Sequence, residues 1–170
     1  MSTETQIDDL ITIVDAPAVP GLTFRRFSGN GDFTNMLRLI EGSKSADQIE
    51  RTQTLEDIER AYEHLHNCDP YKDVLFAEVN GEAIAYNRVF WEELDDGDYI
   101  YTLFGFLLPD WRRKGIGTAM LQYGEQRLRQ IASQHPLKTP KVFQSWAADT
   151  EIGAEALLKS LGYAAVRHGL

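Results

Sequence analysis

The chain has 170 residues, 43% of them hydrophobic and 25% charged, with a net charge of −9. These values are typical of one globular domain, and the acidic balance argues against nucleic acid or an anionic membrane as the main partner. The single cysteine, Cys68, excludes an internal disulfide and suits a reducing compartment. The sequence contains neither a signal-peptide pattern nor the ~18-residue apolar run of a membrane-spanning helix, so we expect a cytoplasmic protein.

The first 20 residues are acidic, with Pro17 and Pro20 near their end. We expect residues 1–20 to form a flexible N-terminal arm, because little ties such a segment down. Residues 21–170 are expected to form one domain. Its first element is a strand over Leu22–Phe27, where polarity alternates.

Two helices are predicted next. Gly42 is expected to end the first, whose apolar face has the spacing i, i+3, i+4, i+7 at Phe33, Met36, Leu37 and Ile40. Thr54 and Asp57 form a capping pattern for the second, which would carry His64 and His66. Positions two apart point to different sides of a helix, so solvent-facing histidines are favoured over a metal-binding pair. We predict no metal site.

A hairpin is predicted in the middle of the chain. Val74–Val79 and Ala83–Trp91 have strand patterns, and Asn80-Gly81 between them is a strong turn signal. The acidic segment Glu92–Asp98 follows. It could bind calcium or a cationic substrate, but it lacks EF-hand ligand spacing, which favours a solvated hairpin turn.

The most informative stretch begins with Tyr99–Leu108, an apolar and aromatic run typical of a strand buried on both faces. Pro109 ends this strand, because proline cannot donate to a sheet. A basic turn, Arg112–Lys114, then leads through Gly115-Ile116-Gly117 into a helical pattern. The first amides of a helix have no internal partner and the helix dipole favours negative charge there, so this turn is predicted to bind an anion. The glycine spacing fits neither a Walker P-loop nor a dinucleotide fingerprint.

The rest of the chain continues the alternation. The helix from Ile116 is followed by a strand over Lys141–Trp146 and a last helix that ends at Gly162, with Tyr163–His168 as a final strand. The order is β-α-α-β-β-β-α-β-α-β. It predicts an α/β (α+β) fold, with a mixed and mostly antiparallel sheet flanked by helices.

Arg112-x-x-Gly115-x-Gly117, after a strand that ends Leu107-Leu108-Pro109, resembles the acyl-CoA signature of the GNAT superfamily of N-acyltransferases. The resemblance extends over Leu22 to Leu170. It implies acetyl-CoA, or another acyl-CoA, as co-substrate. It places the pantetheine arm and thioester on the strand end and the diphosphate on the turn. The implied binding residues are Phe106, Leu107, Leu108, Arg112, Arg113, Lys114, Gly115, Ile116, Gly117 and Thr118.

The chain departs from the family pattern at the positions that usually move protons. Leu158 stands where the family often has a tyrosine that protonates the leaving thiolate, and Glu151 replaces an asparagine. The strand position that often holds a carboxylate base is Tyr101. The catalytic acid and base therefore stay unassigned, with four substitutes to consider: Tyr101, Tyr86, Glu92 and Glu93.

The resemblance implies an acetyl-CoA-dependent N-acetyltransferase that acts on a small-molecule or peptide amine by direct attack in a ternary complex. The alternative is a catalytically silent acyl-CoA-binding or scaffolding half-domain. The span from Gln144 to Tyr163 also resembles the first halves of tandem GNAT proteins, such as mycothiol-synthase-like enzymes. Only one strand fits after Gly162 where the family usually has two. A homodimer or a second GNAT domain is therefore a candidate partner.

Overall fold

The computed structural model describes residues 10–48, 50, 53–145 and 152–164. Six strands form one sheet in the order β1-β2-β3-β4-β5-β6, and every neighbouring pair is antiparallel except β5 and β6, which are parallel. This confirms the predicted mixed, mostly antiparallel sheet. The elements are β1 (Leu10–Ile11), β2 (Leu22–Arg26), α1 (Gly31–Asp47), α2 (Leu55–Glu63), α3 (Pro70–Asp73), β3 (Val74–Val79), β4 (Glu82–Glu93), β5 (Tyr99–Leu107), a 3-10 turn (Pro109–Trp111), α4 (Ile116–Ala132), β6 (Lys141–Gln144) and α5 (Ile152–Ser160).

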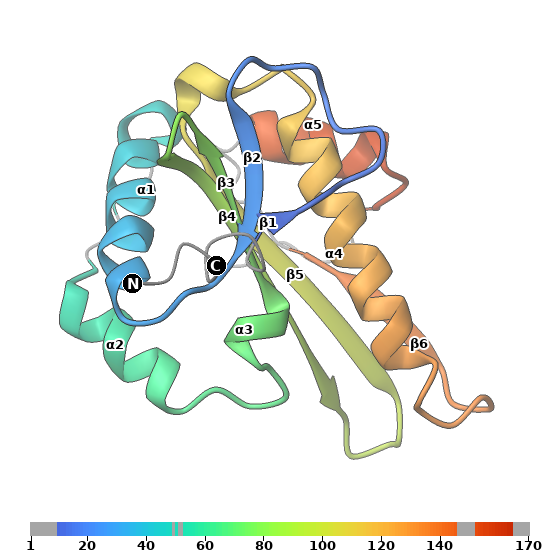
Figure 1. Ribbon diagram of the computed structural model, residues 1–170. Helices are drawn as coiled ribbons and strands as arrows, with labels where there is room; N and C mark the ends of the chain where they lie inside the picture. Colours follow the sequence, from blue (N-terminus) through green and yellow to red (C-terminus); the bar gives the residue numbers. More distant parts are fainter. Residues whose placement is uncertain (1–9, 49, 51–52, 146–151, 165–170) are drawn as a thin grey trace.

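Helices cover both faces of the sheet. Figure 1 shows α1 and α2 on one side of the strands and α4 on the other, alongside β5. Apolar side chains of α1 and α2 pack with Phe76 and Tyr86, whereas α4 packs through Ile116, Met120 and Leu128. Alternate residues of each strand therefore enter different cores. Among the described residues, no helix has both the length and the apolar character to cross a membrane.

The first helix is longer than predicted. Gly42 does not end α1, which continues to Asp47 and closes on Gln48 in the left-handed conformation, with φ 53°. A Cβ atom on Gly42 would lie 2.6 Å from Cδ2 of Leu108. The glycine therefore allows α1 to pack closely on the end of β5, and it does not end the helix.

The second helix begins as predicted and ends earlier. Thr54 and Asp57 form the reciprocal capping box, with Asp57 N–H donating to Thr54 Oγ1 at 3.1 Å. The helix ends at Glu63, so His64 is its C-cap and His66 lies in the following loop. The prediction that α2 carries both histidines is wrong, because the helix ends before them.

The central hairpin forms as predicted. Asn80 and Gly81 both have positive φ, 51° and 84°, as the tightest hairpin turns require. Strand β4 is longer than expected and includes Glu92 and Glu93, which pair with Ile100 and Tyr99. Only the segment after Glu93 forms the turn, so the prediction that both glutamates belong to it is wrong.

At its two ends the chain is described from Leu10 and as far as Ala164. Leu10 and Ile11 pair with β2, and Ile11 and Ile13 pack on the core, so this part of the predicted arm is ordered on the domain. Gly162 has φ 92°, as expected of a left-handed helix terminus. Trp146 and most of the strand expected over Tyr163–His168 lie outside the described residues.

Candidate functional site

A cavity of about 840 Å³ opens where β5, the start of α4, α5 and the end of α1 meet. Backbone and side chains of β4 and β5 form its floor, and the basic turn before α4 forms one wall. Its lining residues are Ser43, Asp47, Ala85, Tyr86, Asn87, Phe104, Gly105, Phe106, Leu107, Pro109, Arg112, Arg113, Gly115, Gly117, Thr118, Met120, Leu121, Ser145, Ala156, Leu157, Leu158 and Ser160.

The start of α4 faces this cavity without a side-chain cap. Gly115 is the N-cap in the left-handed conformation, with φ 86°. The first amides of a helix have no carbonyl partner within it, and no side chain among the residues that the structure describes caps this end. Since Gly115, Gly117 and Thr118 line the cavity, the end of the helix that favours negative charge lies at its wall.

Arg112 of the signature is held by the protein itself. Its guanidinium forms two bonds to the Asp47 carboxylate, at 2.5 and 2.7 Å, and Nε donates to the Leu107 carbonyl at 3.0 Å. Asp47 is buried, at 8% side-chain exposure. Arg112 thus ties the turn to the end of α1 and to β5. The exposed Arg113 and Lys114 supply the cationic side chains of the turn.

Strands β5 and β6 stop pairing below the cavity. Their parallel register runs from Tyr99–Lys141 to Thr102–Gln144, and within the described part of the chain no strand pairs with the rest of β5, as far as Leu107, on that side. The Leu107 carbonyl is turned away from β4, since it accepts from Arg112. In a strand the N–H and C=O of one residue point the same way, so the Leu107 N–H also faces the open edge. The Leu108 N–H donates to the Ile84 carbonyl at 3.0 Å and is occupied.

Most of the residues predicted to bind acyl-CoA line the cavity: Phe106, Leu107, Arg112, Arg113, Gly115, Gly117 and Thr118. Three are not among the lining residues. Ile116 is fully buried in the core between α4 and the sheet, and Leu108 packs against both α1 and that core. Lys114 is exposed on the turn.

The candidates for proton transfer are separated. Tyr86 lines the large cavity, but Tyr101 does not: it is 0% exposed and its hydroxyl is 2.6 Å from Nδ1 of His135. Burial raises the pKa of Tyr101, and burial together with Lys141 lowers the pKa of His135. Glu92 lines a different, smaller cavity, and Glu93 is exposed at the end of β4.

Sequence reasoning missed the polar lining residues Ser43, Asp47, Asn87, Ser145 and Ser160. Asp47 and Ser43 lie beyond the predicted end of α1, which is why the helix was not expected to reach the site. Asn87 is buried and donates from Nδ2 to the Met120 carbonyl at 2.8 Å, which joins β4 to the first turns of α4. A polar residue in the middle of the apolar run Ala83–Trp91 was the available signal.

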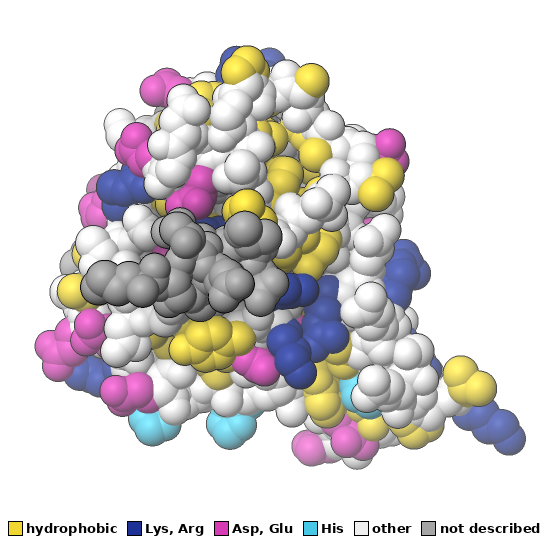
Figure 2. Space-filling view, in the orientation of Figure 1, with side chains coloured by type: hydrophobic (Ala, Val, Ile, Leu, Met, Phe, Trp, Pro, Cys, Tyr) yellow, Lys and Arg dark blue, Asp and Glu magenta, His cyan; other side chains and the backbone are white. Residues whose placement is uncertain are grey.

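The face drawn in Figure 2 carries acidic and basic side chains interspersed rather than in a field of one sign. Although the whole chain has a net charge of −9, the turn at the cavity is basic. Binding of an anion here would depend on the helix end and the adjacent cations, not on the overall charge.

Several solved structures share this fold. A GCN5-related N-acetyltransferase from Sphaerobacter thermophilus aligns with a TM-score of 0.74 and 23% identity over 90% of this chain and 45% of its own. The chain thus spans less than half the length of that protein. The YncA protein of Salmonella typhimurium, a putative acetyltransferase with its cofactor acetyl-CoA, aligns with a TM-score of 0.61 and 19% identity over 86% of this chain and 82% of its own.

A third structure is the aminoglycoside N-acetyltransferase AAC(6')-Iy in complex with CoA. It aligns with a TM-score of 0.63 and 13% identity over 91% of this chain and 95% of its own. At these identities the likeness is one of fold. No curated protein matches the chain. The acetyltransferase (GNAT) family model matches residues 37–163, more than half of the sequence, and the chain belongs to that family.

Proposed function

We propose that the chain is an acetyl-CoA-dependent N-acetyltransferase that transfers the acyl group to a primary amine by direct attack in a ternary complex. Acetyl-CoA is the co-substrate of this family. The observation that carries the proposal is the uncapped start of α4, which lies at the wall of an 840 Å³ cavity beside the unpaired edge of β5.

The diphosphate of the coenzyme would lie at the first amides of α4. Helix starts bind phosphate because their amides and the helix dipole act together. Gly117 is closely packed, since a Cβ atom there would lie 3.0 Å from Cδ2 of Leu157, which would have to shift by a few tenths of an ångström. Arg113 and Lys114 add charge, while Arg112 keeps the turn in position through Asp47.

The thioester would then lie along β5, where the Leu107 N–H faces the open edge. The amine nitrogen attacks the thioester carbonyl carbon, the C–S bond breaks, and the sulfur leaves as a thiolate that takes up a proton. One preorganised donor to the developing oxyanion is typically worth about 3 kcal/mol. At the strand end, the Leu108 N–H already donates to the Ile84 carbonyl, so we assign the role to the Leu107 N–H.

Proton transfer at this site is assigned to Tyr86. It is the member of the four candidates that lines the cavity. Acid–base assistance typically contributes 10²–10⁴-fold, so its loss is measurable. A small-molecule or peptide amine is the acceptor class, and nucleic acid and membrane surfaces are not.

A second candidate function is a catalytically silent acyl-CoA-binding half-domain, with a second GNAT domain or another copy as partner. It is favoured by Leu158, which lines the cavity where the family often has a tyrosine, and by the absence of a carboxylate from Tyr99–Leu108. The length of the Sphaerobacter protein, of which the chain spans 45%, agrees with it.

Two measurements separate the candidates. The first is the thermal shift with CoA, where a ligand at 100 times its Kd should stabilise the protein by about 2.7 kcal/mol. The second is thiol release from acetyl-CoA over a panel of primary amines. Binding with turnover supports the transferase, and binding without turnover on any amine supports the silent domain.

The double variant Arg113→Glu with Lys114→Glu should abolish the CoA shift. The matched control, Lys72→Glu with Lys138→Glu, makes the same change of charge at exposed lysines away from the cavity and should retain it. An unchanged CoA shift in the first variant would contradict the assignment of the turn.

A further inference from the structure

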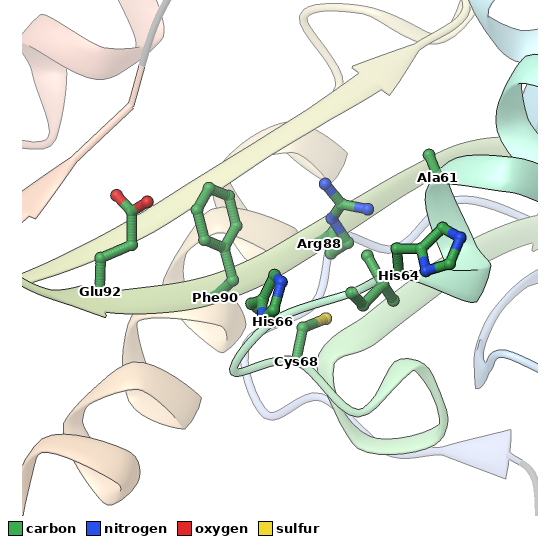
Figure 3. Close-up of a pocket in the computed structure, with 8 residues that line it drawn as sticks. Ala61, His64, His66, Cys68, Arg88, Phe90 and Glu92 are labelled. Atoms are coloured by element: carbon green, nitrogen blue, oxygen red, sulfur yellow. The ribbon is translucent and has the colours of Figure 1, made fainter.

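A second, smaller cavity of about 260 Å³ lies on the α1 and α2 side of the sheet. Figure 3 shows Arg88 and Phe90 projecting into it from β4, with His64 at the end of α2, His66 and Cys68 in the loop that follows, and Glu92 farther along the strand. Nothing in the proposed function uses this cavity.

Arg88 is an unusual residue for the wall of such a cavity. Among the described residues no carboxylate forms an ion pair with its guanidinium, and Nε is buried without a hydrogen-bond acceptor. It lies instead among three aromatic rings, with Cζ at 4.8 Å from the ring centroid of Phe104, 5.1 Å from Tyr62 and 5.7 Å from Phe90. Cation–π contacts offset part of the cost of burying a charge but supply no hydrogen-bond acceptor.

The groups around Arg88 do not neutralise it. Burial raises the pKa of Cys68 to about 12 and that of Tyr62 to about 12, so both stay protonated and uncharged near neutral pH. The buried Tyr62 hydroxyl has no hydrogen bond of normal geometry, although the nearby Arg88 offsets part of the rise in its pKa. Glu92 is exposed to solvent. The carboxylate of Asp73 contributes to the raised pKa of Cys68, but it is already paired with Arg127, whose Nε donates a hydrogen bond to it at 2.7 Å. Two buried polar atoms without a hydrogen bond of normal geometry beside one cavity call for an explanation.

Phe104 lies between Arg88 and the large cavity. This residue lines the large cavity, and it is the cross-strand partner of Arg88, whose guanidinium lies over its ring. A ligand group bound to Arg88 would therefore lie beside a residue of the proposed acyl-transfer cavity. The histidines at the rim, His64 and His66, add donors rather than negative charge.

We propose that the small cavity is an anion subsite in which Arg88 binds a carboxylate of the amine acceptor. The acceptor is then a primary amine that also carries a carboxylate, such as an amino acid or the end of a peptide. This inference rests on the proposed function. The guanidinium presents forked donors that match a carboxylate, and the bound anion would give the buried Nε an acceptor.

The test compares acceptors that differ only in the anion. Thiol release from acetyl-CoA is measured with α- and ω-amino acids and with their matching carboxamides, and with phosphoethanolamine against ethanolamine. A charged hydrogen bond lost with the carboxamide predicts a kcat/KM about 10- to 100-fold higher for the carboxylate. Calorimetric titration of the CoA complex with the same pairs gives a readout independent of turnover.

Two variants test whether Arg88 causes the preference for the carboxylate. Arg88→Gln should bring the carboxylate-to-amide ratio to about one, and Arg88→Lys, which keeps the charge without the fork, should give an intermediate ratio. Arg60→Gln changes an exposed residue of α2 that pairs with Glu56; it is the control and should retain the full ratio. If Arg88→Gln fails to fold, Arg88→Lys and the unmodified protein still decide the question.

The outcomes separate the two proposals. A carboxylate preference that disappears with Arg88 supports the subsite, and acetylation or binding of acids and amides alike overturns it while the transferase stands. A preference for phosphoethanolamine with none for carboxylates also overturns it, because the recognised anion is then a phosphate. Absence of CoA binding contradicts the proposed function itself. An Arg88 with a purely structural role would change thermal stability without changing the ratio.

Discussion

Arg112 and Asp47 join two elements that are 65 positions apart in the chain. The guanidinium holds both carboxylate oxygens, at 2.5 and 2.7 Å, and its Nε donates to the Leu107 carbonyl. Arg112, the first residue of the acyl-CoA signature, thus holds the turn in place through its hydrogen bonds to α1 and β5. Its neighbours, Arg113 and Lys114, remain exposed for a ligand.

We predict that removal of either partner weakens both the fold and the binding of CoA. Asp47→Asn and Arg112→Met should each lower the free energy of unfolding by about 1–3 kcal/mol, because a charged hydrogen bond is lost in a partly buried place. The double-mutant cycle, measured by denaturant unfolding, should show coupling of more than about 0.5 kcal/mol. The exposed pair Arg60 and Glu56 is the comparison, expected at about 0.3–0.5 kcal/mol. Additive effects of the two substitutions would contradict the predicted coupling between Arg112 and Asp47.

Gly115 gives a prediction about backbone conformation at the cavity. Its φ of 86° is strained for any residue with a Cβ atom, so Gly115→Ala should cost about 1–2 kcal/mol and shift the first amides of α4. CoA affinity should fall with it. Gly97→Ala introduces the same strain, at φ 90°, in the exposed turn before β5, and should destabilise the protein without weakening CoA binding. Equal losses of affinity in both variants would show that Gly115 has no local role.

Asp32 gives a prediction about pH. Burial would raise its pKa, but hydrogen bonds from Arg25, Ser28 and Asn35 outweigh burial and hold the pKa below its ordinary value. The unfolded chain therefore binds more protons than the folded one, and stability should fall as the pH drops below about 4. Asp32→Asn should be less stable at neutral pH and should flatten this acid dependence, measured as Tm against pH. Asp95→Asn, in the exposed turn, should leave the dependence as it is.

The two tyrosines considered for proton transfer should behave differently. Tyr101→Phe removes a hydrogen bond to His135 and should cost about 0.5–1.5 kcal/mol of stability while leaving kcat/KM within about twofold. Tyr86→Phe should lower kcat and change its pH profile, because Tyr86 lines the cavity. The opposite ranking of the two variants in thiol release would transfer the role to Tyr101.

The sequence was most informative where local chemistry decides the structure. The Thr54–Asp57 capping box, the Asn80-Gly81 hairpin and the left-handed Gly162 depend on neighbouring residues alone, and each was predicted. The order of helices and strands along the chain was also predicted from periodicity, except for β1 and the short helix α3. That strand has two residues and is held by pairing with β2, which periodicity cannot detect.

The errors lie where distant contacts decide. Gly42 resembles a helix stop, yet it is a contact point between α1 and Leu108, so the end of the helix and Asp47 were placed wrongly. Arg112 lines the cavity as the resemblance implies, but its pairing with Asp47 could not be foreseen because it depends on that missed turn of helix. Arg88 was read as one more residue of a strand, because only the folded chain places three rings around it.

The most direct test of the central claim is an amide chemical-shift titration of the isotopically labelled protein with CoA. We predict that the largest shifts fall on the N–H groups of Gly115, Ile116, Gly117 and Thr118, and that pantetheine, which lacks the diphosphate, leaves these four nearly unmoved. If CoA binds while these amides keep their positions in the spectrum, or if CoA fails to bind at saturating concentration, the start of α4 is not the diphosphate site.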